Sequence, residues 1–100
     1  MSEPIYPGLE ADQRGGLTDA GRVIMDAQAF GLLPATETGA GWSMARLQNL
    51  AEQVNKAWSP FGGLPSRLPQ DLRERHERIY AAAVERARAV GWDDELVDDE

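Results

Sequence analysis

His76 is the only histidine of the chain, so acid–base or phosphoryl chemistry near neutral pH would depend on it. A histidine that accepts a phosphoryl group needs exposure and a nearby cation, which Arg73 or Arg75 could supply. However, His76 shares an apolar stripe with Leu72 and Ile79 at helical spacing. This stripe favours a histidine that faces the core or its margin and pairs with a carboxylate or a carbonyl. A His76-based phosphotransfer protein or minor enzyme component is therefore the first alternative function.

Other sets of catalytic or metal-binding residues are incomplete. The chain has four serines, but only His76 could activate one, and nothing around them resembles a nucleophile elbow. The glycine pairs at 15–16 and 62–63 lack the G-x-x-x-x-G-K-[ST] spacing of a phosphate-binding loop. There is no cysteine, and the acids near position 100 lack the ligand spacing of a calcium loop. We therefore predict no catalytic residue, no metal site and no cofactor.

Composition narrows the class of protein further. Hydrophobic residues make up 42% of the 100 residues, which argues against wholesale disorder. No run approaches the roughly 18–20 apolar residues that a membrane span needs, and the start of the chain does not resemble a signal peptide. These observations predict a cytoplasmic protein that makes no membrane contact. Nine arginines against one lysine point to a GC-rich coding sequence, as in many bacteria.

Charge is distributed unevenly along this acidic chain, whose net charge is −7. Residues 66–90 hold six arginines against four acids, whereas residues 91–100 hold six acids and no base. An acidic protein repels the phosphate backbone, and the five arginines of the third predicted helix do not fall on one face. Nucleic-acid binding is therefore disfavoured, and a nucleic-acid-associated protein that uses the arginine-rich helix is the second alternative function.

Apolar residues at helical spacing predict three helices. The first spans about Asp19–Phe30, with Thr18 as its N-cap and Gly31 at its end. The second spans about Ser43–Trp58, and the third spans about Pro69–Val90. β-branched residues are scarce, and no stretch alternates apolar and polar residues over the length of a strand. The sequence therefore predicts an all-α fold, a small irregular three-helix bundle with long ordered loops and mobile termini.

We divide the chain into a mobile N-terminal segment 1–16, a helical domain 17–92 and an acidic C-terminal tail 93–100. The connections 31–42 and 59–68 are longer than most connections between bundle helices. The residues expected to be mostly buried are Leu50, Val54, Trp58, Leu72, Ile79 and Ala83.

The 59–68 loop is the predicted docking site. Phe61 and Leu64 are apolar residues in a stretch that Pro60 and Pro65 stiffen, and a rigid loop loses little entropy on binding. Arginines beside the loop can form forked hydrogen bonds to carboxylates. The candidate interface residues are Phe61, Leu64, Arg67, Arg73 and His76. In the alternative interpretation, Phe61 and Leu64 cover the core and do not bind a partner. This interpretation is favoured over docking, because the alanine-rich core is thin.

Since catalytic residues are missing and nucleic-acid binding is disfavoured, the sequence predicts a small, non-catalytic protein–protein interaction or regulatory module. Its expected partner is another protein, and the sequence does not fix an oligomeric state or a pathway.

Overall fold

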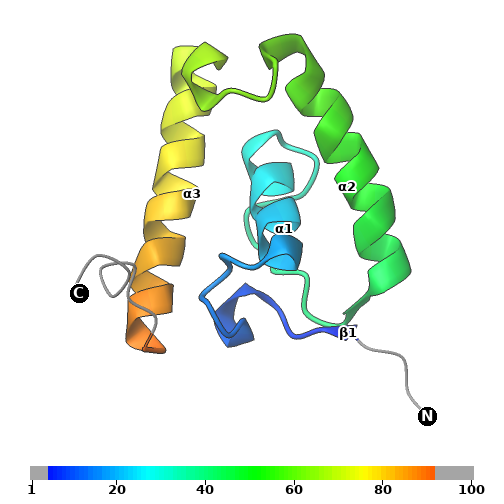
Figure 1. Ribbon diagram of the computed structural model, residues 1–100, viewed down its shortest axis with the longest axis vertical. Helices are drawn as coiled ribbons and strands as arrows, with labels where there is room; N and C mark the ends of the chain where they lie inside the picture. The colour runs from blue at the N-terminus through cyan, green and yellow to red at the C-terminus, as the bar shows by residue number, and fades with distance from the viewer. Residues whose placement is uncertain (1–4, 92–100) are drawn as a thin grey trace, which may run out of the picture.

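The computed structural model describes residues 5–91 and shows three α-helices (Figure 1). These are α1 (Asp19–Ala29), α2 (Met44–Trp58) and α3 (Gln70–Ala89). Each helix begins and ends within one residue of its predicted bounds, and the all-α prediction is confirmed. Within residues 5–91, no helix is both long enough and apolar enough to cross a lipid bilayer.

The helix ends follow from the residues at their caps. The Thr18 hydroxyl accepts a hydrogen bond from the amide of Gly21, and the Ser43 hydroxyl accepts one from the amide of Arg46. Both side chains pair amides that a first helical turn otherwise leaves free. At the end of α1, Gly31 adopts a φ of +78°, a left-handed conformation that ends a helix. The predicted N-cap Thr18 and the predicted helix end at Gly31 are thus present.

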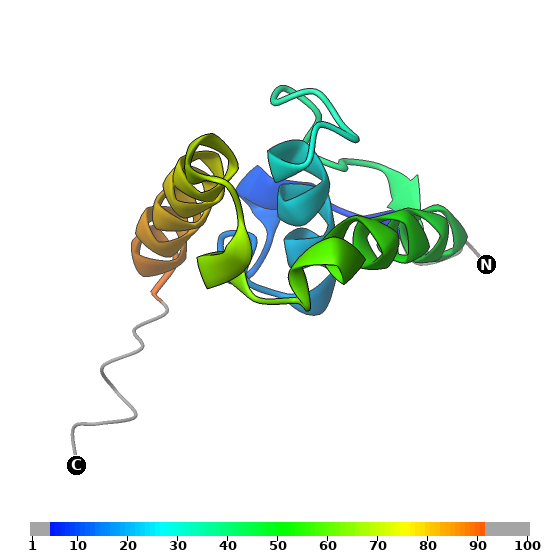
Figure 2. The ribbon, with the colours of Figure 1, turned by 90° about the horizontal axis from the view of Figure 1, so that it is seen from above.

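The central element of the fold is α1. The helices α2 and α3 diverge from the loop that joins them, and α1 fills the space between them (Figures 1 and 2). Ile24 and Met25, on α1, are completely buried because α1 packs against both outer helices. The buried hydrophobic residues of the main core are Tyr6, Leu9, Ile24, Met25, Ala27, Trp42, Leu47, Leu50, Val54 and Ala83.

The N-terminal part of the chain differs from the prediction. We expected a mobile segment over 1–16, but residues 5–16 pack onto α1, and only 1–4 lie outside the described residues. Strand β1 (Ile5–Tyr6) pairs antiparallel with β2 (Trp42–Ser43), and a 3-10 turn, η1 (Leu9–Ala11), follows β1. Tyr6 is buried here, where it pairs with Trp42 of β2 and its hydroxyl donates to Asp12. A two-residue strand is too short to show an alternating pattern in the sequence. The predicted tail 93–100 lies outside the described residues.

The predicted core is half correct. Leu50, Val54 and Ala83 are buried, as expected. The other three residues, Trp58, Leu72 and Ile79, are only partly buried. Leu72 and Ile79 are only partly covered because α3 packs mainly against one short helix, α1.

Candidate functional site

A cleft of about 380 Å³ opens where the three helices meet the 59–68 loop. Its walls come from segments that are far apart in the sequence, so only the folded chain forms it. The residues that line the cleft are Arg22 and Asp26 from α1, Asn55 and Trp58 from α2, Gly63 and Pro65 from the loop, and His76 and Tyr80 from α3.

Asp26 connects the three helices at the base of this cleft. Its Oδ1 accepts a hydrogen bond of 2.7 Å from the Tyr80 hydroxyl, and its Oδ2 accepts one of 3.2 Å from Trp58 Nε1. The Nε2 of His76 lies 3.5 Å from Oδ1. Both carboxylate oxygens of Asp26 therefore already accept hydrogen bonds within the protein. Asp26 is less available to bind a ligand than an unpaired carboxylate would be.

Tyr80 is held as a hydrogen-bond donor in this cluster. Burial raises the pKa of its hydroxyl well above the ordinary range, and the negative charge of Asp26 raises it further. The phenol therefore remains protonated at physiological pH and keeps donating to Asp26.

The imidazole of His76 is packed between aromatic rings. It stacks on Tyr80, with ring centroids 4.5 Å apart, and meets Trp58 edge to face at 5.6 Å. Only 13% of the His76 side chain is exposed. A carboxylate on one ring nitrogen is the arrangement that orients catalytic bases, but here the packing leaves the ring little room to approach a substrate. The geometry gives His76 a positioning role that joins α3 to α1 and α2.

Arg22 is the cation that the cleft presents to solvent. Its side chain is exposed, the arginine–carboxylate pair among residues 5–91 is Arg88–Glu85, and the cleft carboxylate Asp26 lies beside His76. Within the described part of the chain, Arg22 therefore has no carboxylate partner. Asn55, an exposed residue of α2, also lines the cleft. Together these two side chains suit an anionic group better than a cationic one.

The 59–68 loop is held in shape by its own backbone. It contains two 3-10 turns, η2 (Ser59–Phe61) and η3 (Pro65–Arg67). The amides at 62–64, 67 and 68 all donate to carbonyls within 58–65. Leu68 is buried and fixes the far end of the loop to the protein. The loop is thus ordered before any partner arrives.

The predicted interface residues of this loop take different positions. Phe61 is half-buried and stacks on Phe30, whose ring meets Trp58 edge to face. Phe61 therefore covers the end of the bundle. Leu64 is 49% exposed and lies between Gly63 and Pro65, which line the cleft. Phe61 and Leu64, which were predicted to form one interface, therefore have different environments in the structure.

The other three candidate residues lie in η3 and in the first half of α3. Arg67 is exposed in η3, and Arg73 is half-exposed near the start of α3. Of the five candidates, only His76 lines the cleft. Sequence reasoning missed Arg22, Asp26 and Tyr80, which the fold brings to His76 from other segments.

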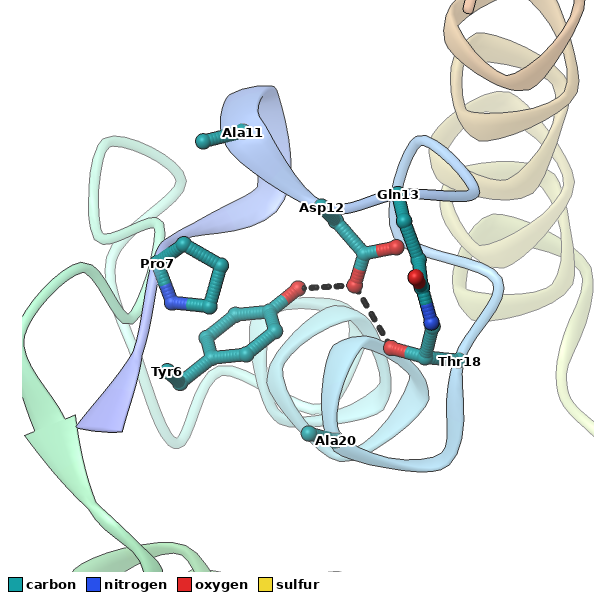
Figure 3. A pocket seen from close by; sticks show the side chains of 7 residues that line it. All are labelled: Tyr6, Pro7, Ala11, Asp12, Gln13, Thr18 and Ala20. Carbon is teal, nitrogen blue, oxygen red and sulfur yellow. Dashed lines mark hydrogen bonds between the residues drawn. The ribbon is translucent and has the colours of Figure 1, made fainter. Parts of the chain in front are cut away.

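A second hollow, of about 410 Å³, lies over the N-terminal segment and contains a buried carboxylate (Figure 3). Asp12 is 3% exposed and accepts hydrogen bonds from the Tyr6 hydroxyl, the Thr18 hydroxyl and the amide of Arg14. Burial by itself raises the pKa of Asp12, but these hydrogen bonds outweigh it and lower the pKa below its ordinary value.

The hydrogen bonds of Asp12 to Tyr6 and Thr18 indicate a structural role for these three residues. The same Thr18 hydroxyl caps α1, so Asp12 fastens β1 and the following turn to the start of that helix. Burial and then the neighbouring Asp12 raise the pKa of Tyr6 above the ordinary range, which keeps its hydroxyl a donor. Because the polar atoms of Asp12, Tyr6 and Thr18 satisfy one another, the cleft beside Arg22 is the better candidate for binding.

Comparison with known proteins gives no match: neither a family model, nor a curated protein, nor a solved structure is similar to this chain. The candidate site is therefore interpreted from its geometry alone.

Proposed function

We propose that this protein is a non-catalytic protein–protein interaction module. Its docking surface consists of the cleft, with Arg22 and Asn55, and the adjoining loop, with Leu64 and Arg67. The partner that fits this surface is a protein segment in which a carboxylate lies next to an apolar side chain.

The exposed guanidinium of Arg22 in the cleft is the observation that carries this proposal. The only carboxylate in the cleft wall is that of Asp26, and both of its oxygens accept hydrogen bonds from Tyr80 and Trp58. Arg22 has no ion pair within the described residues. A guanidinium left free beside a satisfied carboxylate supports the docking of a partner's Asp or Glu.

Leu64 supplies the apolar half of the surface. It is half-exposed on a loop whose amides are paired internally, so its position changes little when a partner binds. Burying it against a partner costs little conformational entropy. An apolar anchor with arginine at its rim is a common composition of protein interfaces.

The arginines of α3 favour a protein partner over a nucleic acid. Arg75 Nη1 donates to the carbonyl of Ala29 at 3.1 Å, and Arg86 Nε donates to the carbonyl of Gly15 at 2.8 Å. These two cations fasten α3 to the rest of the fold. Phosphate binding needs several free cations on one face, and this use of Arg75 and Arg86 reduces their number.

The test is a selection from a library of random peptides displayed on phage. The full chain is the bait, and parallel selections use Arg22→Gln, Leu64→Ser and the control Arg78→Gln, which changes an exposed arginine away from the cleft. We expect the wild type and the control to enrich peptides with Asp or Glu next to an apolar residue. Each of the other two variants should lose that enrichment.

Two outcomes would contradict the proposal. One is that no peptide is enriched by the wild-type chain. The other is that enriched peptides lack acidic residues, or bind Arg22→Gln and Leu64→Ser as well as they bind the wild type. Thermal unfolding of each variant shows whether it is folded before the selection is interpreted.

A further inference from the structure

The cleft contains a residue of the type whose charge changes most readily around neutral pH. Histidine is the side chain that ordinarily gains or loses its charge between about pH 5 and 8. His76 is the only histidine of the chain, which also has no cysteine. It lines the cleft, and 13% of its side chain is exposed, so solvent can exchange protons with the ring through the opening.

The charged and titratable groups around His76 come from α1 and α3. On α1, Asp26 Oδ1 lies 3.5 Å from His76 Nε2, and Arg22 lines the same cleft. On α3, Arg73 lies one turn before His76, and Tyr80 lies one turn after it. The hydroxyl of Tyr80 stays protonated, since burial and then the charge of Asp26 raise its pKa. The other residues that line the cleft carry no charge: Asn55 and Trp58 of α2, and Gly63 and Pro65 of the loop.

Protonation of His76 changes the net charge that a ligand meets in the cleft. While the imidazole is neutral, the charges of Arg22 and Asp26 cancel among the groups that line the cleft. An imidazolium adds a positive charge beside the carboxylate of Asp26 and offsets it. The positive charge of Arg22 is then in excess, so the lining of the cleft changes from neutral to positive as the pH falls.

We infer that a falling pH strengthens the docking of the acidic partner, because protonated His76 offsets the charge of Asp26 beside the incoming carboxylate. This inference rests on the proposed function and adds the regulation of the same site. While His76 is neutral, Asp26 repels the partner's carboxylate and weakens its attraction to Arg22. Binding of an anion and binding of a proton to the neighbouring imidazole favour each other, so the direction of the effect follows from charge alone.

The test measures how the affinity for one peptide depends on pH. The probe is a dye-labelled peptide from the phage selection that has Asp or Glu next to an apolar residue, contains no histidine or cysteine, and has blocked termini. The charge of such a peptide is nearly constant between about pH 5.5 and 8. Fluorescence anisotropy with the full-length chain should give a Kd that is about threefold or more lower at the acidic end of this range.

Three controls assign the pH dependence to His76 and to the carboxylate of the peptide. His76→Gln keeps a polar side chain that does not titrate, and its Kd should vary less than about 1.5-fold over the same range. Arg78→Gln removes an exposed cation of α3 outside the cleft and should keep the full pH dependence. Replacing the acidic residue of the peptide by glutamine should abolish the pH dependence with the wild-type chain, a result that does not require the His76→Gln variant to fold.

The reciprocal effect of the peptide on His76 gives an independent measurement. Because the chain has one histidine, its imidazole Cε1–Hε1 group gives a single signal in a carbon–proton NMR spectrum. Saturating peptide should move the midpoint of the titration of this signal to higher pH, by about half a pH unit for a threefold change in Kd. A histidine with a structural role alone would titrate at the same pH with and without the peptide.

The failure of this inference differs from the failure of the proposed function. If the peptide binds with the same Kd at both ends of the pH range, or if the His76 signal does not titrate within it, the inference is wrong and the proposed function stands. A pH dependence that persists in His76→Gln, or with the glutamine peptide, contradicts the inference in the same way. If no displayed peptide binds the chain, both proposals are wrong.

Discussion

The hydroxyl of Tyr80 in α3 donates a 2.7 Å hydrogen bond to Asp26 in α1, across 54 positions of the sequence. Trp58 in α2 donates to the other oxygen of the same carboxylate. A single acidic side chain thus holds the three helices at the end of the bundle where the candidate site opens. Mutations in this cluster should therefore change the stability of the fold and the shape of the cleft together.

Tyr80→Phe should lower the free energy of unfolding by about 1–2 kcal/mol, because it removes one hydrogen bond to a charged group. Asp26→Ala should cost more, since it leaves the donors of Tyr80 and Trp58 unpaired. Urea denaturation of both single variants and of the double variant gives their coupling energy. A coupling energy near zero would show that the two residues do not interact in solution.

Asp12→Asn should reduce stability in a pH-dependent way. The hydrogen bonds to Asp12 lower its pKa in the folded state below the ordinary 3.8. The carboxylate therefore contributes stability at pH values above about 4, and this contribution is lost as the pH falls through the lowered pKa. The difference in unfolding free energy between wild type and variant should be largest near neutral pH and should shrink in acid. Chemical denaturation at several pH values measures it.

The matched control for this prediction is Asp19→Asn, which removes an exposed carboxylate at the start of the same helix. It should show a small effect that reflects the helix dipole. An Asp12→Asn variant that loses the same stability at every pH would mean that packing, and not ionisation, accounts for the loss.

Gly15→Ala should be strongly destabilising. Gly15 has a φ of +66°, and a Cβ there would lie 2.3 Å from the backbone nitrogen of Ala87 in α3. The methyl group would force α3 away from the turn that it packs on, at a cost of about 3 kcal/mol or more. Gly31→Ala is the control, since its φ is also positive but no atom lies within 4 Å of the added Cβ. It should cost about 1–2 kcal/mol in thermal unfolding.

Phe61→Ala and Leu64→Ala should have different effects on stability. Phe61 stacks on Phe30, so its removal should cost about 1–2 kcal/mol and lower the melting temperature by several degrees. Leu64 is half-exposed, and its removal should change the unfolding free energy by less than about 0.5 kcal/mol. Equal and large losses at both positions would mean that Leu64 also covers the core, which would remove the apolar anchor from the docking surface.

Local signals were sufficient to predict the helices. Thr18, Ser43 and Gly31 act on residues within one turn of themselves, so their effect is visible in a short window of sequence. The 59–68 loop was predicted to be ordered for a similar reason, since its prolines and glycines act locally. The packing of Tyr6 and Leu9 was missed because the N-terminal segment depends on Asp12 and on β2, which are tertiary partners.

The candidate site was predicted only in part, because it depends on distant pairs. The sequence placed His76 on an apolar stripe and predicted a carboxylate or carbonyl partner. It did not identify Asp26, which lies 50 positions earlier. Asp26 falls at the edge of the apolar stripe of α1, between Val23 and Phe30, which is a weak sign of a polar group directed towards a neighbouring element. No local pattern relates Asp26 to Tyr80 or Trp58, since the loop geometry decides where α3 meets α1.

The short central helix has a consequence for how the chain folds. α1 has 11 residues, fewer than an isolated helix needs to persist in water. It therefore depends on packing against its neighbours, and α2 and α3 in turn bury apolar residues against it. Nine of the ten buried residues of the main core lie between Tyr6 and Val54, so the N-terminal segment, α1 and α2 retain most of the core without α3. A chain cut within the 59–68 loop should therefore yield an N-terminal fragment that keeps part of its structure alone and an α3 fragment that is unfolded until the two are mixed.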